Sequence, residues 1–158
     1  MTIEKKRIIV TGSASGMGEA TLNAYVKAGA HVIGMDVSDE KGITICDEAN
    51  KNGPGKCSYI HVDVSDKSSV TNSFLKANDI LGGLDTLANP AAIQRSSDAS
   101  DVSVEDWDLM FAVNVKGTML TNQAAYSIMK LNGGGSIINF GSISGLRPEP
   151  SASAYSSA

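Results

Sequence analysis

Several residue types that mark particular protein classes are scarce in this chain of 158 residues. Its two cysteines, Cys46 and Cys57, are too few for a disulfide framework or a zinc site, and they favour a reducing compartment. The 13 Lys and Arg form no basic run and are outnumbered by 17 Asp and Glu, which argues against a protein that tracks a nucleic-acid backbone. The apolar stretches are short, and the one behind the N-terminal basic residues covers only residues 8–10. We therefore expect no membrane span, no signal peptide and a cytoplasmic location.

The chain has enough apolar material for a folded core, since 42% of its residues are hydrophobic. Its length is typical of one domain, so we expect residues 1–158 to form a single domain. The 16 glycines stand at the ends of periodic segments rather than in a repeat. They therefore mark the boundaries of secondary-structure elements.

Strand-like and helix-like segments alternate along the whole chain. The run Arg7-Ile-Ile-Val-Thr11 is typical of a strand buried on both faces, and further strands are expected over residues 31–36, 57–62, 84–89 and 136–140. Helical periodicity predicts helices over residues 16–28, 39–51, 66–81, 104–113 and 115–131, with another beginning near Ala152. This alternation predicts a doubly wound α/β fold with a parallel sheet and right-handed crossovers. The chain ends as the last helix begins, so we expect the first five strands to be present and the C-terminal strands to be missing.

A glycine-rich segment, Thr11-Gly-Ser-Ala-Ser-Gly-Met-Gly18, lies between the first expected strand and the first expected helix. Glycine lets the backbone turn tightly and approach a pyrophosphate without a Cβ in the way, and the following helix N-terminus offers free N–H groups to the phosphates. A tight strand–helix turn without a ligand is the alternative. The residues expected to hold a dinucleotide in this loop are Gly12, Ser15, Gly16, Met17 and Gly18.

Asp36 ends the second expected strand, 18 positions after Gly18, where a carboxylate can accept hydrogen bonds from an adenosine ribose. Val37 and Ser38 follow it, so no adjacent Lys or Arg is present to hold a 2′-phosphate. The alternative is that Asp36 caps the next helix. The pattern favours NAD over NADP as the cofactor.

Further motifs follow one another along the rest of the chain. They are Asp63-Val64 after the third strand, Asn89-Pro-Ala-Ala92 after the fourth, Phe111-Ala-Val-Asn-Val115 in the helical region, Ser142 after the fifth strand, and Tyr155, 13 positions after Ser142. The glycine loop has the spacing Gly-x3-Gly-x-Gly instead of the Gly-x-Gly-x-x-Gly of most Rossmann dehydrogenases. Together these features resemble the short-chain dehydrogenase/reductase family, which has a Rossmann-type fold, over the whole chain.

The resemblance implies hydride transfer between NAD(H) and a secondary alcohol or ketone. It implies that Tyr155 is the general acid/base, that Ser142 hydrogen-bonds the substrate oxygen, and that Asn114 orders a water in a proton relay. A phenol with the usual pKa near 10 needs a nearby cation before it can act as a base at neutral pH. The resemblance assigns the remaining cofactor contacts to Asp63, Val64, Asn89 and Ala91.

Two positions depart from the family's pattern. The family's Asn-Asn-Ala-Gly motif has Pro90 and Ala92 in this chain, so we expect an altered wall beside the nicotinamide rather than lost binding. The family's Tyr-x-x-x-Lys motif places its lysine directly after Ala158, the last residue. We therefore expect the chain to be truncated before the catalytic lysine, as the N-terminal part of a larger single-domain enzyme. A noncatalytic NAD-binding module is the alternative function if no more chain follows.

The resemblance also implies a homodimer or homotetramer, in which the helix over residues 115–131 and the one near Ala152 pack against partner subunits. The first of these helices carries apolar residues on more than one face, as expected between a sheet and a partner: Met119, Leu120, Ala124, Ile128 and Met129. No carboxylate–His cluster points to a catalytic metal, so we expect none. The expected substrate is a small alcohol or ketone, in a site lined by residues 92–96 and 143–150. Steroids, cyclic alcohols, polyols and 3-oxoacyl thioesters are all candidate substrate classes.

Overall fold

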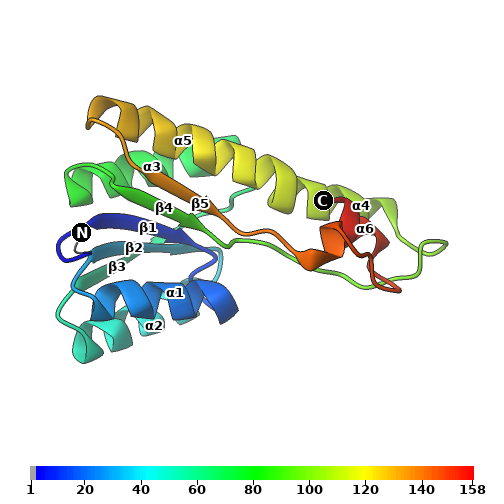
Figure 1. Cartoon of the computed structure of the whole chain (residues 1–158), viewed down its shortest axis with the longest axis horizontal. Coiled ribbons are helices and arrows are strands. Elements are labelled where there is room, and N and C mark those ends of the chain that lie inside the picture. The colour runs from blue at the N-terminus through cyan, green and yellow to red at the C-terminus, as the bar shows by residue number, and fades with distance from the viewer. Residues whose placement is uncertain (1–2) are drawn as a thin grey trace.

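A computed structural model describes residues 3–158 and places a parallel sheet at the centre of the molecule (Figure 1). The strands are β1 (Arg7–Thr11), β2 (His31–Asp36), β3 (Lys56–His61), β4 (Thr86–Asn89) and β5 (Ser136–Asn139). Their order in the sheet is β3-β2-β1-β4-β5, and every neighbouring pair is parallel. The chain builds outward from β1 in one direction and then crosses over to β4 on the other side. This confirms the predicted doubly wound α/β fold with five strands.

Helices flank this sheet and continue beyond one end of it. They are α1 (Gly16–Lys27), α2 (Asp39–Asn52), α3 (Lys67–Leu81), α4 (Val104–Met110), a π-helix (Phe111–Gly117), α5 (Thr118–Leu131), a short 3-10 helix (Ile143–Gly145) and α6 (Ser153–Ser157). Figure 1 shows α1 and α2 on one face and α3 and α5 on the other. Parallel strands joined by right-handed helical crossovers require this two-sided covering.

The two faces carry separate apolar cores because alternate residues of a strand point to opposite sides. Ile8 belongs to the core under α1 and α2, where it packs with Leu22. Ile9 belongs to the core under α3 and α5, together with Phe74. All four side chains are fully buried, so β1 is the buried strand that its sequence predicts.

The region predicted as two helices, over residues 104–113 and 115–131, differs from that prediction. It is one continuous helical run in which α4 passes into the π-helix and the π-helix into α5, with no break at Asn114. Gly117 closes the π-helical segment at a close contact, since a Cβ there would lie 2.9 Å from Val64 Cγ2. The helical run therefore continues through the wider π-helical turn, and Gly117 of that turn packs against Val64 in the turn after β3.

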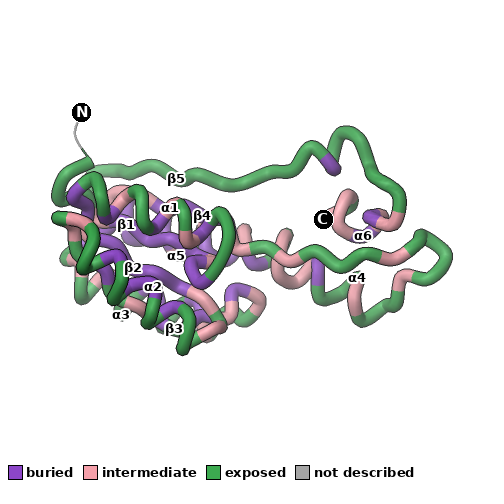
Figure 2. Tube along the Cα trace, turned by 90° about the horizontal axis from the view of Figure 1, so that it is seen from below, coloured by how far each residue is buried: buried purple, intermediate pink, exposed green. Residues whose placement is uncertain are grey.

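The edge strand β5 is exposed along its whole length, as the green tube in Figure 2 shows. Ile137 and Ile138 are 37% and 43% exposed although they pair with Leu87 and Ala88 of β4, which are buried. The apolar sequence of β5 therefore has no cover within residues 3–158. In the same part of the chain, no helix combines the length and the apolar character needed to cross a membrane.

Candidate functional site

The glycine-rich loop lies at the carboxyl end of β1, where the sheet order reverses between β1 and β4. Gly12 has a φ of +58°, and a Cβ there would lie 2.8 Å from the Cα of Ala91 in the segment after β4. A Cβ on Gly18 would collide with the carbonyl oxygen of Gly12. These two glycines let the loop fold back on itself and against the segment after β4. Ligands of doubly wound folds bind in the crevice at such a reversal.

The N-terminus of α1 opens from this loop. Ser15 occupies the N-cap with an extended backbone, and its side chain makes no capping hydrogen bond to the helix. The first N–H groups of a helix have no intrahelical partner, and the helix dipole adds partial positive charge there. This end of α1 can therefore receive an anionic group such as a phosphate.

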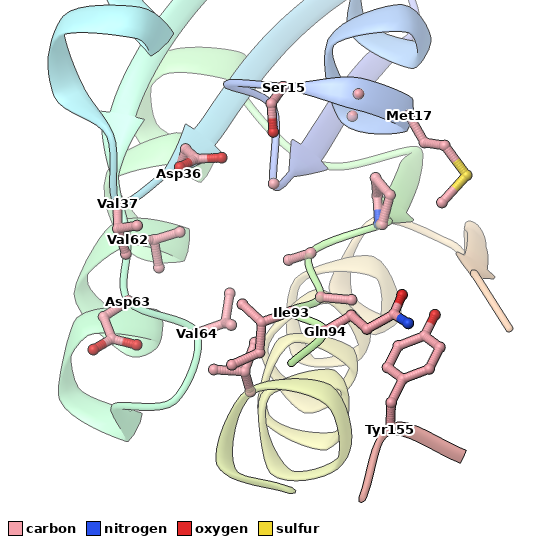
Figure 3. Close-up of a pocket in the computed structure, with 17 residues that line it drawn as sticks. Ser15, Met17, Asp36, Val37, Val62, Asp63, Val64, Ile93, Gln94 and Tyr155 are labelled. Atoms are coloured by element: carbon pink, nitrogen blue, oxygen red, sulfur yellow. The ribbon is translucent and has the colours of Figure 1, made fainter. Parts of the chain in front are cut away.

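A cleft of about 480 Å³ runs beneath the loop (Figure 3). Nine of the ten predicted cofactor residues line it: Gly12, Ser15, Gly16, Met17, Gly18, Asp36, Asp63, Val64 and Ala91. They come from the glycine loop, the end of β2, the turn after β3 and the segment after β4. The structure thus brings together residues from four separate parts of the sequence.

Asp36 sits beside the glycine loop at the end of β2. One carboxylate oxygen accepts a hydrogen bond from the Ala14 N–H (3.0 Å), and the other accepts one from the Ser38 N–H (3.0 Å). Ser38, not Asp36, is the N-cap residue of α2. The carboxylate therefore fixes the loop against the β2–α2 turn while it lines the cleft.

Asp36 is also supported from behind by Tyr59 of β3. The Tyr59 hydroxyl lies 2.6 Å from the backbone carbonyl oxygen of Asp36 and 2.9 Å from Oδ1 of Asp39, both acceptors for its proton. Burial, with the neighbouring Asp39 carboxylate, raises the pKa of Tyr59. The phenol therefore stays a donor at neutral pH.

The turn after β3 forms the next part of the wall. Oδ1 of Asp63 accepts hydrogen bonds from the N–H (2.9 Å) and the hydroxyl (2.7 Å) of Ser65, while the Asp63 N–H donates to Ser69 Oγ (3.0 Å). Val64 follows and packs against Gly117 of the π-helix. The turn is thus held on both sides. No Lys or Arg is among the residues that line the cleft, which all belong to the described part of the chain.

Asn89 is buried, with 4% of its surface exposed, and its side chain joins four elements. Its Oδ1 accepts from the Thr11 hydroxyl (2.6 Å), and its Nδ2 donates to Thr121 Oγ1 (2.8 Å) and Asn139 Oδ1 (3.3 Å). These bonds lock β1, β4, β5 and α5 together where the sheet order reverses. The polar atoms of the Asn89 side chain thus bind protein groups in this structure. Its predicted contact with the cofactor stays a prediction. No motif in the sequence points to Thr121 as a partner of Asn89.

A second cavity of about 260 Å³ adjoins the cleft and contains all three predicted catalytic residues, Asn114, Ser142 and Tyr155. The two spaces share Met17, Pro90, Ala91, Ala92 and Tyr155 as lining residues. Pro90 comes directly after the last residue of β4, so its missing N–H removes no bond from the sheet.

Asn114 fixes the segment after β4 through its side chain. Its Oδ1 accepts from the Ile93 N–H (2.9 Å), and its Nδ2 donates to the Ile93 carbonyl (2.9 Å). This reciprocal pair joins the π-helix to Ile93, which lines the cleft next to the shared residues 90–92. The predicted role of Asn114 in ordering a water stays a prediction beside this positioning role.

Ser142 precedes the 3-10 helix, and its Oγ accepts a hydrogen bond from the Ser144 N–H (3.2 Å). Tyr155 lies on α6 and lines both spaces, and Figure 3 shows its hydroxyl directed toward the Gln94 amide.

A contact that the sequence patterns did not predict holds α6 in place. Ser97 forms a parallel bridge with Ala152, and its N–H donates to the Ser151 carbonyl (2.9 Å). Within residues 3–158, no group of three or more His, Cys, Asp and Glu is placed to hold a metal ion.

Known proteins have similar sequences and share this fold. The sequence model of a family described as short chain dehydrogenase matches residues 6–158. The uncharacterized oxidoreductase YxbG of Bacillus subtilis is 34% identical over 157 residues, which cover 99% of this chain and 57% of that protein. The 2,5-dichloro-2,5-cyclohexadiene-1,4-diol dehydrogenase LinX of Sphingobium indicum is 34% identical over 95% of this chain and 60% of its own length.

Solved structures give the same result. The crystal structure of a protein described as a short-chain alcohol dehydrogenase from Sinorhizobium meliloti superposes with a TM-score of 0.92 at 30% identity. That match covers 98% of this chain and 61% of the other. This chain therefore spans 57% to 61% of the length of these three proteins.

Proposed function

Because the chain belongs to the short-chain dehydrogenase family, we propose that it transfers a hydride between NAD(H) and a secondary alcohol or ketone. One observation carries this proposal. Ser142 and Tyr155 line a single cavity, and that cavity shares a wall with the cleft under the glycine loop. A substrate oxygen in the cavity would thus lie among hydroxyl groups beside a dinucleotide in the cleft.

The residues of the cleft fit a dinucleotide. The open N-terminus of α1 and the glycine loop suit its pyrophosphate, and Asp36 suits the hydroxyl groups of its adenosine ribose. The absence of Lys and Arg among the described lining residues supports NAD over NADP, because a 2′-phosphate would meet only acidic charge there. When bound, this cofactor would accept or supply the hydride.

The protein's own groups would handle the proton and the developing charge. Tyr155 would give a proton to the substrate oxygen in reduction and remove it in oxidation, which requires a neighbouring positive charge to favour its phenolate. Ser142 would donate its hydroxyl proton to the same oxygen and stabilise negative charge there. Asn114 would order a water in a proton relay, while its bonds to Ile93 hold that part of the cleft wall in place.

We also propose a cytoplasmic homodimer or homotetramer. Cys46 and Cys57 are both free thiols, which suits a reducing compartment. The long helical run has two apolar sides: Leu120, Ile128 and Met129 are buried toward the sheet, whereas Met119 is 44% exposed. The outer side is available to a partner subunit.

The test is turnover by the purified full-length protein. We expect NADH oxidation with some members of a ketone panel and NAD⁺ reduction with the matching alcohols, and the panel includes cyclic diols because LinX is a cyclohexadienediol dehydrogenase. Tyr155→Phe should keep NADH affinity but lose kcat by about 100-fold or more, the usual contribution of a general acid/base. Tyr25→Phe, at a half-buried tyrosine of α1 that lines neither the cleft nor the cavity, is the matched control and should leave turnover unchanged.

Two results would contradict the proposal. Tight NADH binding without turnover of any alcohol or ketone would favour the noncatalytic NAD-binding module. Equal kcat values for Tyr155→Phe and the unmodified protein would remove Tyr155 from the chemistry.

A further inference from the structure

The only two cysteines of the sequence, Cys46 and Cys57, lie side by side inside the fold. Cys46 is on α2 and Cys57 is on β3, and their Sγ atoms are 2.8 Å apart. Their residues are 3% and 7% exposed, and neither lines the cleft or the adjoining cavity. The pair is thus separate from the proposed active site.

Neighbouring residues hold the two sulfur atoms together. Asn50, one helical turn after Cys46, brackets the backbone of Cys57: its Nδ2 donates to the Cys57 carbonyl (3.0 Å), and its Oδ1 accepts from the Cys57 N–H (2.8 Å). Gly34 of β2 leaves the space beside them, since a Cβ there would lie 3.3 Å from Cys46 Sγ. The packing of α2 against β3 therefore sets the short distance between the two sulfur atoms.

The two thiols are not equivalent. Cys57 Sγ donates its proton to Cys46 Sγ, and this hydrogen bond lowers the pKa of Cys46. The same contact, with burial, raises the pKa of Cys57. Cys46 is therefore the sulfur that ionises first, and the thiolate is the form that reacts with oxidants.

We propose that Cys46 and Cys57 form a redox-active dithiol, which a hydroperoxide converts reversibly into an intramolecular disulfide. A disulfide has an S–S length of about 2.05 Å, so the sulfurs need to approach each other by less than about 1 Å. Small displacements of α2 against β3 would supply this movement, and a small oxidant such as hydrogen peroxide suits a pair that is almost fully buried.

The reaction proceeds in two steps. The Cys46 thiolate attacks one peroxide oxygen, the O–O bond breaks, and hydroxide leaves with the proton that Cys46 has lost, as water. Cys57 Sγ then attacks the sulfur of the resulting sulfenic acid; the S–S bond forms, the S–O bond breaks, and the hydroxyl departs with the Cys57 proton as a second water. The dithiol loses two electrons and two protons in total, and a reducing dithiol reverses the change.

The link would join two elements next to the adenosine end of the cleft. α2 begins three residues after Asp36, and β3 ends two residues before Asp63, which both line the cleft. Oxidation would thus tie together the supports of these two residues without touching Ser142 or Tyr155. The inference does not depend on the identity of the substrate or on the choice between NAD and NADP.

The first experiment uses the unmodified full-length protein. It is reduced, exposed to hydrogen peroxide, unfolded and treated with a maleimide, and the labelled residues are located by mass spectrometry of a non-reducing digest. We expect labels at both positions before oxidation, and after it a cross-linked peptide pair that contains Cys46 and Cys57 and is released by dithiothreitol. Undiminished labelling of both thiols, or cross-links only between separate chains, would overturn the proposal.

Single substitutions test the order of the two steps. With Cys57→Ala, we expect oxidation to stop at the sulfenic acid of Cys46, which a dimedone probe traps. With Cys46→Ala, we expect Cys57 to take up at least tenfold less probe under the same exposure. Equal trapping at the two positions would contradict the assignment of Cys46 as the attacking sulfur. The cross-link in the unmodified protein needs no substitution, so a variant that folds poorly does not decide the outcome.

Discussion

Asp36 lines the cleft with a carboxylate whose two oxygens each accept a main-chain hydrogen bond. The donors, Ala14 and Ser38, are neutral N–H groups, so they fix the carboxylate without neutralising it. An ionised carboxylate has about four lone-pair sites, so acceptor capacity remains for ribose hydroxyls. A 2′-phosphate at the same place would bring two like charges together. The proposed preference for NAD thus depends on the charge of one residue.

Asp36→Asn removes this charge and retains one side-chain acceptor for the loop. We expect the affinity for NADPH to rise relative to that for NADH by about tenfold, which corresponds to ~1.4 kcal/mol. Fluorescence titration with the two reduced cofactors measures the ratio. Asp79→Asn, at an exposed carboxylate of α3 outside the cleft, is the matched control and should change the ratio little. A ratio that stays constant in Asp36→Asn would show that the charge does not select the cofactor.

The positions of such residues could be predicted where local structure determines them. Gly12 and Asp36 each sit where a strand ends, so the strand pattern placed them at the same edge of the sheet. The bonds of Asn89 to Thr11, 78 positions away, and to Asn139, 50 positions away, have no local signature. The bridge from Ser97 to Ala152 that holds α6 depends likewise on the tertiary fold.

Among the elements, β1 and the segment before β4 are joined by one ion pair at the end of the sheet opposite the glycine loop. Arg7 Nη2 lies 2.7 Å from Asp85 Oδ1, and the side-chain Nε and main-chain N–H of Arg7 donate to Asp85 Oδ2 at 3.1 and 2.9 Å. The Arg7 guanidinium lowers the pKa of Asp85 to about 2. An unfolded Asp has a pKa near 3.9, so the pair's contribution is present above that pH and is lost as the pH falls toward 2.

We expect Asp85→Asn to lower the free energy of unfolding at pH 7 by about 1 to 2 kcal/mol, because Arg7 loses its charge-assisted acceptor. Between about pH 4 and pH 2 the difference from the unmodified protein should shrink, since protonation removes the same charge from Asp85. Urea unfolding at several pH values measures both quantities. Asp101→Asn, at an exposed loop residue, is the control and should have little effect. A difference that is equal at pH 7 and pH 2 would exclude this ion pair as its cause.

The helical run shows where element prediction failed. Asn114 has a low helix propensity, so its position between two apolar segments favoured two helices with a junction. In the structure its side chain binds the backbone of Ile93, and the surrounding residues form a π-helix instead of a break. This contact joins positions 21 residues apart, so helical periodicity alone cannot predict it.

For the whole molecule, α5 lies with α3 over one face of the sheet, and its other side, together with that of the π-helix, faces solvent. Val115, Met119 and Tyr126 are 42%, 44% and 60% exposed on that outer side. Apolar residues that gather on one side of a surface helix commonly mark a contact with another chain. A second copy of the protein would bury them by placing its own run alongside, which a symmetric dimer requires.

We therefore expect the full-length protein to be a dimer or tetramer in light scattering. Met119→Glu should raise the dissociation constant at least tenfold, because a carboxylate would have to be desolvated between apolar surfaces. Ile43→Glu is the matched control. Ile43 is 51% exposed on α2, on the opposite face of the sheet, so this variant should keep the oligomeric state of the unmodified protein. Circular dichroism checks that both variants keep their helices. A monomer at all concentrations of the unmodified protein would contradict the assembly, and equal dissociation of both variants would place the interface elsewhere.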